Sequence, residues 1–118
     1  MRMFLVRHAR TRRILAWRVR RCDGWLERAV GFLPRKAIAP EEGLWFERCA
    51  AVHTVGMRVP LDIVFLDDAK RVVKAMDGVQ PHRLYVGANG ARTVAEFGAG
   101  FLSANPLQTG DKLELEEV

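Results

Sequence analysis

The sequence has few cysteines and no long apolar segment. Its 118 residues include two cysteines, Cys22 and Cys49, which are too few to form a disulfide framework. The first apolar run covers residues 3–6 and is shorter than the core of a signal peptide, and no run approaches the length that crosses a bilayer. We therefore expect a cytoplasmic protein, located in the cytosol, with reduced cysteines and no membrane span.

Phosphate-binding glycine motifs are also missing. The glycine-rich stretch GANGAR, residues 87–92, lacks both the spacing of a dinucleotide-binding motif and the Lys-Ser/Thr ending of a P-loop. No helical pattern follows it, so we interpret it as a turn. We expect no cofactor.

The composition is that of an ordinary globular protein. Apolar residues make up 49% of the chain and charged residues 28%. A chain of this length can bury a core without covalent cross-links. We expect residues 1–118 to form a single domain.

The positive charge is concentrated in the first third of the chain. Residues 1–36 hold eleven Lys or Arg and two acidic residues, whereas residues 37–118 hold eight basic and twelve acidic residues. Such a segment can face an anion such as nucleic acid. Arginines along strand edges, however, also keep a protein soluble and discourage edge pairing. Because no glycine-rich or aromatic-interleaved binding motif accompanies them, we expect weak nucleic-acid binding at most.

One main helix is predicted at about residues 24–33. Asp23 is a suitable N-cap, because its carboxylate can accept a free N–H of the first turn. Pro34 ends the pattern. The apolar residues recur at helical spacing at Trp25, Leu26, Ala29, Val30 and Leu33.

The rest of the chain indicates β structure. Residues 3–6 and 14–20 suit an antiparallel hairpin, with Leu15, Trp17 and Val19 on one side. The run LDIVFL, residues 61–66, predicts a central strand buried on both faces. Residues 101–104 could form one helical turn. Further strand-like segments lie at 44–46, 49–55, 71–76, 93–97 and 112–117. The pattern is α+β and β-rich, with about seven strands.

Three potential ligands lie at steps of four in one stretch. Cys49, His53 and Met57 are the soft or borderline donors that suit Cu(I). In a strand, however, four residues span roughly 13 Å, too far for one ion. A helix would bring them closer, but β-branched residues, Gly56 and Pro60 disfavour a helix here. A metal site would need a bend at Gly56, so we favour a structural role and expect no metal.

A nucleophilic cysteine is a second interpretation of this stretch. Cys49 could act with His53 or His82 as its base, and the cation of Arg48 would favour the thiolate. No recognisable nucleophile motif surrounds it, so we favour a small, packed cysteine.

Two carboxylates stand among apolar neighbours, Asp62 in the run 61–66 and Glu96 in the run 93–97. A buried carboxylate must be paired, hydrogen-bonded or protonated. We expect Asp62 to hold the HTVGM bend through backbone N–H groups and the Thr54 hydroxyl, with Gly56 at positive φ. The alternative is acid–base chemistry by His53 with Asp62 in a cleft.

Several motifs together resemble one family. GFLPR, GLWF, CAAVHTVGMRVPLDIVFLDD, RVVK, VAEFGAG and LQTGDKLEL follow one another as in the bacterial and archaeal family called domain of unknown function 192 (DUF192). Ala95 and Phe97 replace its usual leucines, and the turn at 67–70 lacks its usual glycine. The matching positions are Gly31, Cys49, His53, Thr54, Gly56, Met57, Pro60, Asp62, Phe65, Asp67, Glu96, Gly100, Gly110 and Asp111.

The resemblance implies a small half-open barrel or sandwich and no established activity, cofactor or partner. Our leading hypothesis is a non-enzymatic binding or accessory domain for a small-molecule or protein ligand. One alternative is a small hydrolase or metal-dependent enzyme that uses His53 with Asp62. A weaker one is anion or nucleic-acid binding through the Arg-rich N-terminal segment. The candidate pocket consists of Cys49, His53, Thr54, Met57, Asp62 and Glu96.

Overall fold

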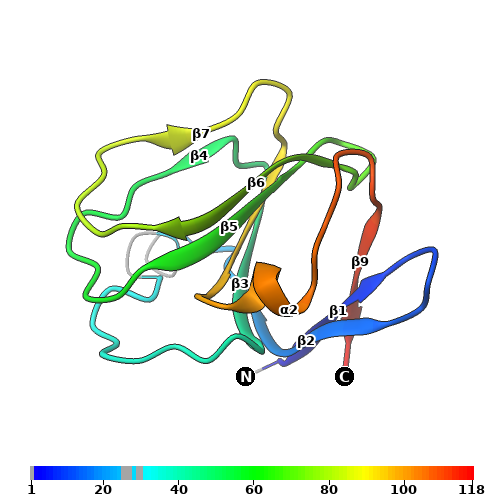
Figure 1. Cartoon of the computed structure of the whole chain (residues 1–118), viewed down its shortest axis with the longest axis horizontal. Coiled ribbons are helices and arrows are strands. Elements are labelled where there is room, and N and C mark those ends of the chain that lie inside the picture. The colour runs from blue at the N-terminus through cyan, green and yellow to red at the C-terminus, as the bar shows by residue number, and fades with distance from the viewer. Residues whose placement is uncertain (1, 25–27, 29–30) are drawn as a thin grey trace.

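The fold is β-rich α+β, as the sequence predicts. The computed structural model describes residues 2–24, 28 and 31–118. Figure 1 shows a strongly curved sheet with one short helix beside it. The described elements are β1 (Phe4–His8), β2 (Ile14–Arg21), β3 (Glu42–Glu47), β4 (Ala51–Val52), β5 (Leu61–Leu66), β6 (Val72–Val79), β7 (Val86–Gly87), β8 (Thr93–Gly98), α2 (Phe101–Ala104) and β9 (Leu113–Glu117).

One large sheet organises the molecule. Its seven strands lie in the order β6-β5-β8-β3-β2-β1-β9, and β4 and β7 form a separate two-stranded sheet. β2 and β3 pair in parallel, which requires the long crossover between them, and the other neighbouring strands are antiparallel. The sheet is not closed into a barrel. Its two edges approach at an isolated bridge between Arg71 and Lys112.

Half of the predicted main helix, residues 24–33, lies outside the described residues. Arg28 is helical, and its backbone N–H donates to the Gly24 carbonyl at 3.0 Å. Residues 31–34 form turns. The predicted single turn of helix at residues 101–104 is confirmed as α2.

The N-terminal hairpin is confirmed, but its inward face differs from the prediction. Trp17, expected to face inward with Leu15 and Val19, is 54% exposed, whereas Ala16 is fully buried. The register shifts between the Phe4–Val19 and Val6–Ala16 pairs. An extra residue in one strand of a pair rotates the side chains that follow it, so simple alternation fails here.

The buried strand at 61–66 is confirmed. Every residue of β5 is buried, and the strand lies between β6 and β8. Its side chains alternate between two apolar clusters on the two faces of the sheet. Val64 and Leu66 belong to the first cluster, and Ile63 and Phe65 belong to the second.

Gly98 closes the end of β8 against a loop. A Cβ atom at this position would lie 2.2 Å from the Ala39 carbonyl oxygen and 2.4 Å from that of Ile38. Only a residue without a side chain lets the 38–39 backbone pass this close. The contact fixes the returning segment of the crossover over the sheet.

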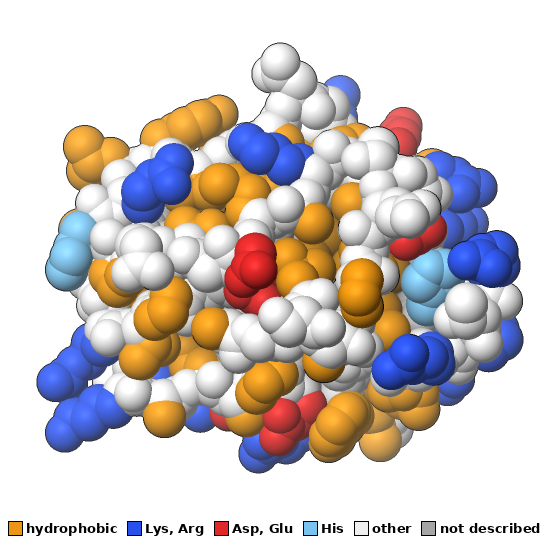
Figure 2. Space-filling view, viewed as in Figure 1, with side chains coloured by type: hydrophobic (Ala, Val, Ile, Leu, Met, Phe, Trp, Pro, Cys, Tyr) orange, Lys and Arg blue, Asp and Glu red, His pale blue; other side chains and the backbone are white. Residues whose placement is uncertain are grey.

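About half of the basic side chains in residues 1–36 are paired with carboxylates among the described residues. On the face shown in Figure 2, Lys and Arg side chains are interspersed with acidic and apolar ones and form no single continuous patch. Six of the eleven basic residues in 1–36 pair with carboxylates, mostly on β9 and at the start of β3. These pairs are Arg2–Glu117, Arg7–Glu116, Arg12–Glu114, Arg18–Glu41, Arg21–Asp23 and Arg35–Glu42.

Candidate functional site

The HTVGM segment is a bend held by Thr54. The Thr54 hydroxyl donates to the Gln80 carbonyl at 2.8 Å and accepts the Arg83 N–H at 2.9 Å. The Thr54 backbone N–H also donates to the Arg83 carbonyl at 2.8 Å. Gly56 has φ +87°, which confirms the predicted left-handed turn. Hydrogen bonds of Thr54 therefore hold the bend against residues 80–83, which lie far away in the sequence.

Asp62 does not hold this bend, which corrects our expectation. One of its carboxylate oxygens accepts the Gly78 N–H and the other accepts the Leu102 N–H, both at 2.8 Å. The Asp62 side chain is fully buried. It ties β6 and the first turn of α2 to β5. Thr54, expected as its partner, instead bonds to Gln80 and Arg83.

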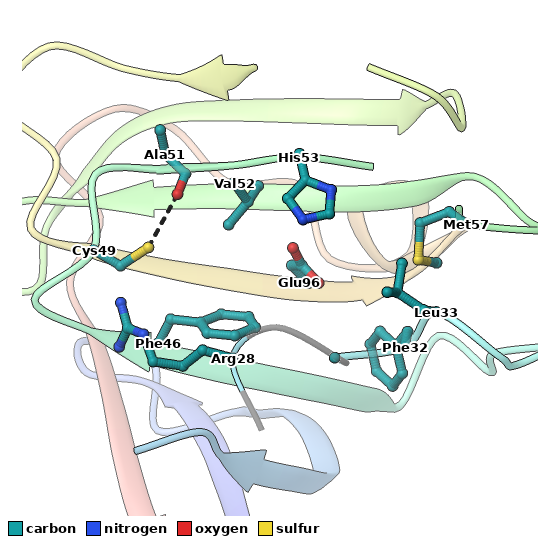
Figure 3. Close-up of a pocket in the computed structure, with 11 residues that line it drawn as sticks. Arg28, Phe32, Leu33, Phe46, Cys49, Ala51, Val52, His53, Met57 and Glu96 are labelled. Atoms are coloured by element: carbon teal, nitrogen blue, oxygen red, sulfur yellow. Dashed lines mark hydrogen bonds between the residues drawn. The ribbon is translucent and has the colours of Figure 1, made fainter. Parts of the chain in front are cut away.

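A small pocket lies beside the bend. Its volume is about 180 Å³. Figure 3 shows the Glu96 carboxylate in the middle of the lining residues, between Val52 and His53 on one side and Phe46 and Leu33 on the other. The described residues that line it are Arg28, Gly31, Phe32, Leu33, Phe46, Cys49, Ala51, Val52, His53, Met57 and Glu96.

Glu96 is the unusual member of this pocket. The residue is 5% exposed, and burial alone raises the pKa of its carboxyl to about 7. No N–H or O–H group in the described part of the chain donates a hydrogen bond to that carboxyl. Leu44 of β3 and Ile63 of β5 are its register partners. Both are apolar and fully buried, so they offer it nothing polar.

Glu96 and Asp62 face opposite sides of the sheet. Asp62 is directly opposite Phe97, and Ile63 is directly opposite Glu96. Successive side chains of a strand point to opposite faces, so the two carboxylates are separated by the sheet itself. The structure therefore does not bring Asp62 and His53 together in one pocket.

The other candidate residues divide by location. His53 is exposed and lines the pocket, and Met57 is buried in its wall. The Cys49 thiol donates to the Ala51 carbonyl at 3.1 Å. Cys49, His53, Met57 and Glu96 thus meet at the pocket, whereas Thr54 supports the bend and Asp62 lies on the other face.

Sequence reasoning missed much of the pocket wall. Phe32 and Leu33 come from the GFLPR motif, and Phe46 comes from GLWF. Both motifs belong to the family resemblance, and this was the signal in the sequence that could have identified them as pocket residues. Arg28 also lines the pocket, but its guanidinium donates to the Glu47 carbonyl at 2.8 Å and lies 5.8 Å from the centre of the Phe46 ring.

Three other observations bear on the hypotheses drawn from the sequence. Within residues 2–24, 28 and 31–118, no three His, Cys, Asp or Glu side chains form a group that could hold a metal ion. Among the same residues, no helix is long and apolar enough to span a bilayer. Cys22 and Cys49 are not bridged. The pocket offers a hydrogen-bond acceptor among apolar walls.

This small β-rich α+β fold is shared with known structures. A protein of unknown function from Novosphingobium aromaticivorans has a similar structure, with TM-score 0.79 and 26% identity. The match covers 94% of this chain and 82% of that chain. A chain from Sinorhizobium meliloti, provisionally described as a transcription regulator, is also similar. The match covers 96% of this chain and 92% of that chain. Its TM-score is 0.80, and its 21% identity shows the fold alone.

The chain belongs to the DUF192 family, described as an uncharacterized ACR, whose model matches residues 6–115. It is 31% identical over 99 residues to a UPF0127 protein of Pyrococcus furiosus, which covers 81% of this chain and 84% of that one. A UPF0127 protein of Pyrococcus abyssi is 32% identical over 98 residues, 78% of this chain and 80% of its own.

Proposed function

We propose that this protein is a cytosolic, single-domain binding or accessory protein, not an enzyme, and that the pocket around Glu96 is its binding site. The observation that carries the proposal is the Glu96 carboxyl. The residue is 5% exposed, its carboxyl is directed into the pocket, and no group in the described part of the chain donates a hydrogen bond to that carboxyl. Buried polar groups that serve only the fold are normally hydrogen-bonded.

Asp62 provides the contrast within the same molecule. Its two oxygens each accept a backbone N–H at 2.8 Å, so its burial is compensated. Glu96 has no such compensation from the described residues, and its burial reduces stability when it is ionised. A ligand that supplied a donor would remove that cost, and this supports a binding role.

The size of the pocket limits the ligand. Sites for drug-sized molecules usually enclose roughly 300–1,000 Å³, and this pocket encloses about 180 Å³. It therefore suits one small organic group, either a free molecule or one side chain of a partner protein.

Proton transfer is a second candidate. A carboxyl whose pKa is raised to about 7 can act as a general acid or base near neutral pH, and His53 lines the same pocket. This replaces the expected pair of His53 with Asp62 by His53 with Glu96. A hydrolytic activity that disappears in both Glu96→Gln and His53→Ala would favour this candidate over the binding protein.

The test is a fragment-binding screen that compares a variant whose pocket is filled by a larger side chain with a control variant whose pocket is unchanged. Small organic fragments would be titrated into the ¹⁵N-labelled protein, and the amide shifts of Phe46, Val52 and Met57 would be followed. In Val52→Phe the larger ring replaces a side chain that lines the pocket, whereas in the matched control Val118→Phe the ring stands at the exposed end of the chain. Binding that is lost in Val52→Phe and kept in Val118→Phe supports the proposal. Failure of every fragment, or equal binding in both variants, rejects it.

A further inference from the structure

We propose that the pocket selects an organic cation, a charged N–H head on a short apolar stem, which enters with its head toward Glu96. This inference rests on the proposed function and names the class of ligand. The shared chemistry is found both in free small amines or guanidines and in the Lys or Arg side chain of a partner protein.

The Glu96 carboxylate determines which charge a ligand of this pocket should carry. An ionised carboxylate only accepts hydrogen bonds, so a head that complements Glu96 must donate them. A neutral donor such as an alcohol would satisfy one lone pair but would leave the negative charge uncompensated in an apolar surrounding. A cation supplies both the hydrogen bond and the opposite charge, and charge-assisted hydrogen bonds are about twice as strong as neutral ones.

The walls suit the stem of such a ligand. Phe32, Leu33, Phe46, Val52 and Met57 line the space around Glu96 with aromatic, aliphatic and thioether groups. An alkyl chain would bury its surface against them, as the methylene stems of Lys and Arg do on protein surfaces. Aromatic faces also attract cations, and Arg28 already lies over Phe46 and Arg35 over Phe32.

Arg28, the arginine in the pocket wall, does not pair with Glu96. Arg28 is the one basic Lys or Arg side chain among the described lining residues, and it donates to the Glu47 carbonyl rather than to Glu96. The other titratable groups that line the pocket are Cys49 and His53, and the register partners of Glu96 on β3 and β5 are the apolar Leu44 and Ile63. Glu96 is therefore the acidic group that a cation would meet.

The inference predicts how binding depends on pH. A cation needs the ionised carboxylate, and with a pKa of about 7 the ionised fraction of Glu96 rises about thirty-fold between pH 5.5 and pH 8. Cation affinity should rise by a similar factor. Affinity for a neutral ligand of the same shape should fall or stay level, because such a ligand gains nothing from the charge.

The experiment compares four-carbon probes that differ in the head group. Butylammonium, butylguanidinium, butanol and butyrate would be titrated by NMR at pH 5.5 and pH 8 into the parent protein, Glu96→Gln and the matched control Glu117→Gln, which changes an exposed carboxylate of β9 away from the pocket. We expect the two cations to bind at least about ten-fold more tightly than butanol at pH 8. This preference should disappear in Glu96→Gln and persist in Glu117→Gln. The amide spectrum of each variant reports whether it is folded.

The outcomes separate this inference from the proposed function. If butanol or butyrate binds as tightly as the cations, or if Glu96→Gln keeps the preference, the inference is wrong while the binding pocket stands. If no probe binds at either pH, both are wrong. A blocked Gly-Lys-Gly peptide, compared with butylammonium, distinguishes the sources: tighter peptide binding supports a partner's side chain, and weaker peptide binding supports a free amine.

Discussion

Asp62 and Leu102 are 40 residues apart in the chain, yet a carboxylate oxygen of Asp62 accepts the Leu102 N–H at 2.8 Å. α2 has no side-chain cap at Gly100, so Asp62 reaches across from β5 to satisfy a donor in its first turn. The second oxygen binds the Gly78 N–H at the edge strand. One buried carboxylate thus joins three elements.

Replacing Asp62 by Ala should strongly destabilise the protein. Two part-buried backbone N–H groups, those of Gly78 and Leu102, would lose their acceptor, and an unsatisfied buried donor costs about 1–3 kcal/mol. We expect the free energy of unfolding to fall by about 2–5 kcal/mol in urea denaturation. Asp62→Asn keeps one carbonyl acceptor and should lose less. If Asp62→Ala unfolds at the parent's urea midpoint, the role given to this residue is wrong.

Glu96 should make the stability depend on pH. Its folded-state pKa is raised from 4.5 to about 7, so the folded state holds the proton more tightly than the unfolded state. The contribution is fully present below about pH 4.5 and is lost as the pH rises through about 7. Glu96→Gln stays neutral throughout. It should match the parent at pH 4 and exceed it by up to about 3 kcal/mol at pH 8.

Denaturation curves of both proteins at several pH values measure this difference. His53→Ala serves as the control, because it leaves the Glu96 carboxyl in place and should retain the parent's loss of stability between pH 4.5 and 7. A constant difference between Glu96→Gln and the parent at all pH values would show that Glu96 is not the titrating group.

Thr54→Val should loosen the bend. The substitution keeps the shape of the side chain but removes both the donor to Gln80 and the acceptor for the Arg83 N–H. We expect a loss of about 1–3 kcal/mol in the free energy of unfolding and faster amide exchange at residues 53–57 and 80–83. Thr54→Ser retains the hydroxyl and is the matched control. Equal exchange rates in the two variants would contradict this role of Thr54.

The arginine-rich segment should bind DNA weakly because about half of its basic side chains are already paired with carboxylates. Fluorescence anisotropy with a short duplex should show weak binding that disappears as salt is added. Changing Glu114, Glu116 and Glu117 to Gln removes the partners of Arg2, Arg7 and Arg12 and should strengthen binding several-fold. Tight binding by the parent at high salt would show that the basic face is a nucleic-acid site.

Local patterns predicted most of the elements. Alternation and β-branched residues identified β5, β6, β8 and β9. Trp17 was misplaced because a register irregularity in the β1–β2 pair has no signature in the sequence. The short pair β4 and β7 carries too few residues to show any period.

The site was predictable in part, for a physical reason. Apolar neighbours identified Asp62 and Glu96 as buried carboxylates, but their roles depend on which face of the sheet each occupies. Asp62 was assigned to Thr54 because the two are close in the sequence, whereas its partners are Gly78 and Leu102. Hydrogen bonds between distant segments are set by the topology, and one sequence does not reveal the topology.

The placement of β1 between β2 and β9 has a consequence for biosynthesis. Arg2 and Glu117 are 115 residues apart and form an ion pair, and all five residues of β1 are paired with β9. During translation β1 can pair with β2 at once, but its other edge stays open until β9 leaves the ribosome. Such an edge can recruit strands from other nascent chains. We therefore expect chains truncated before β9 to aggregate on ribosomes or soon after release.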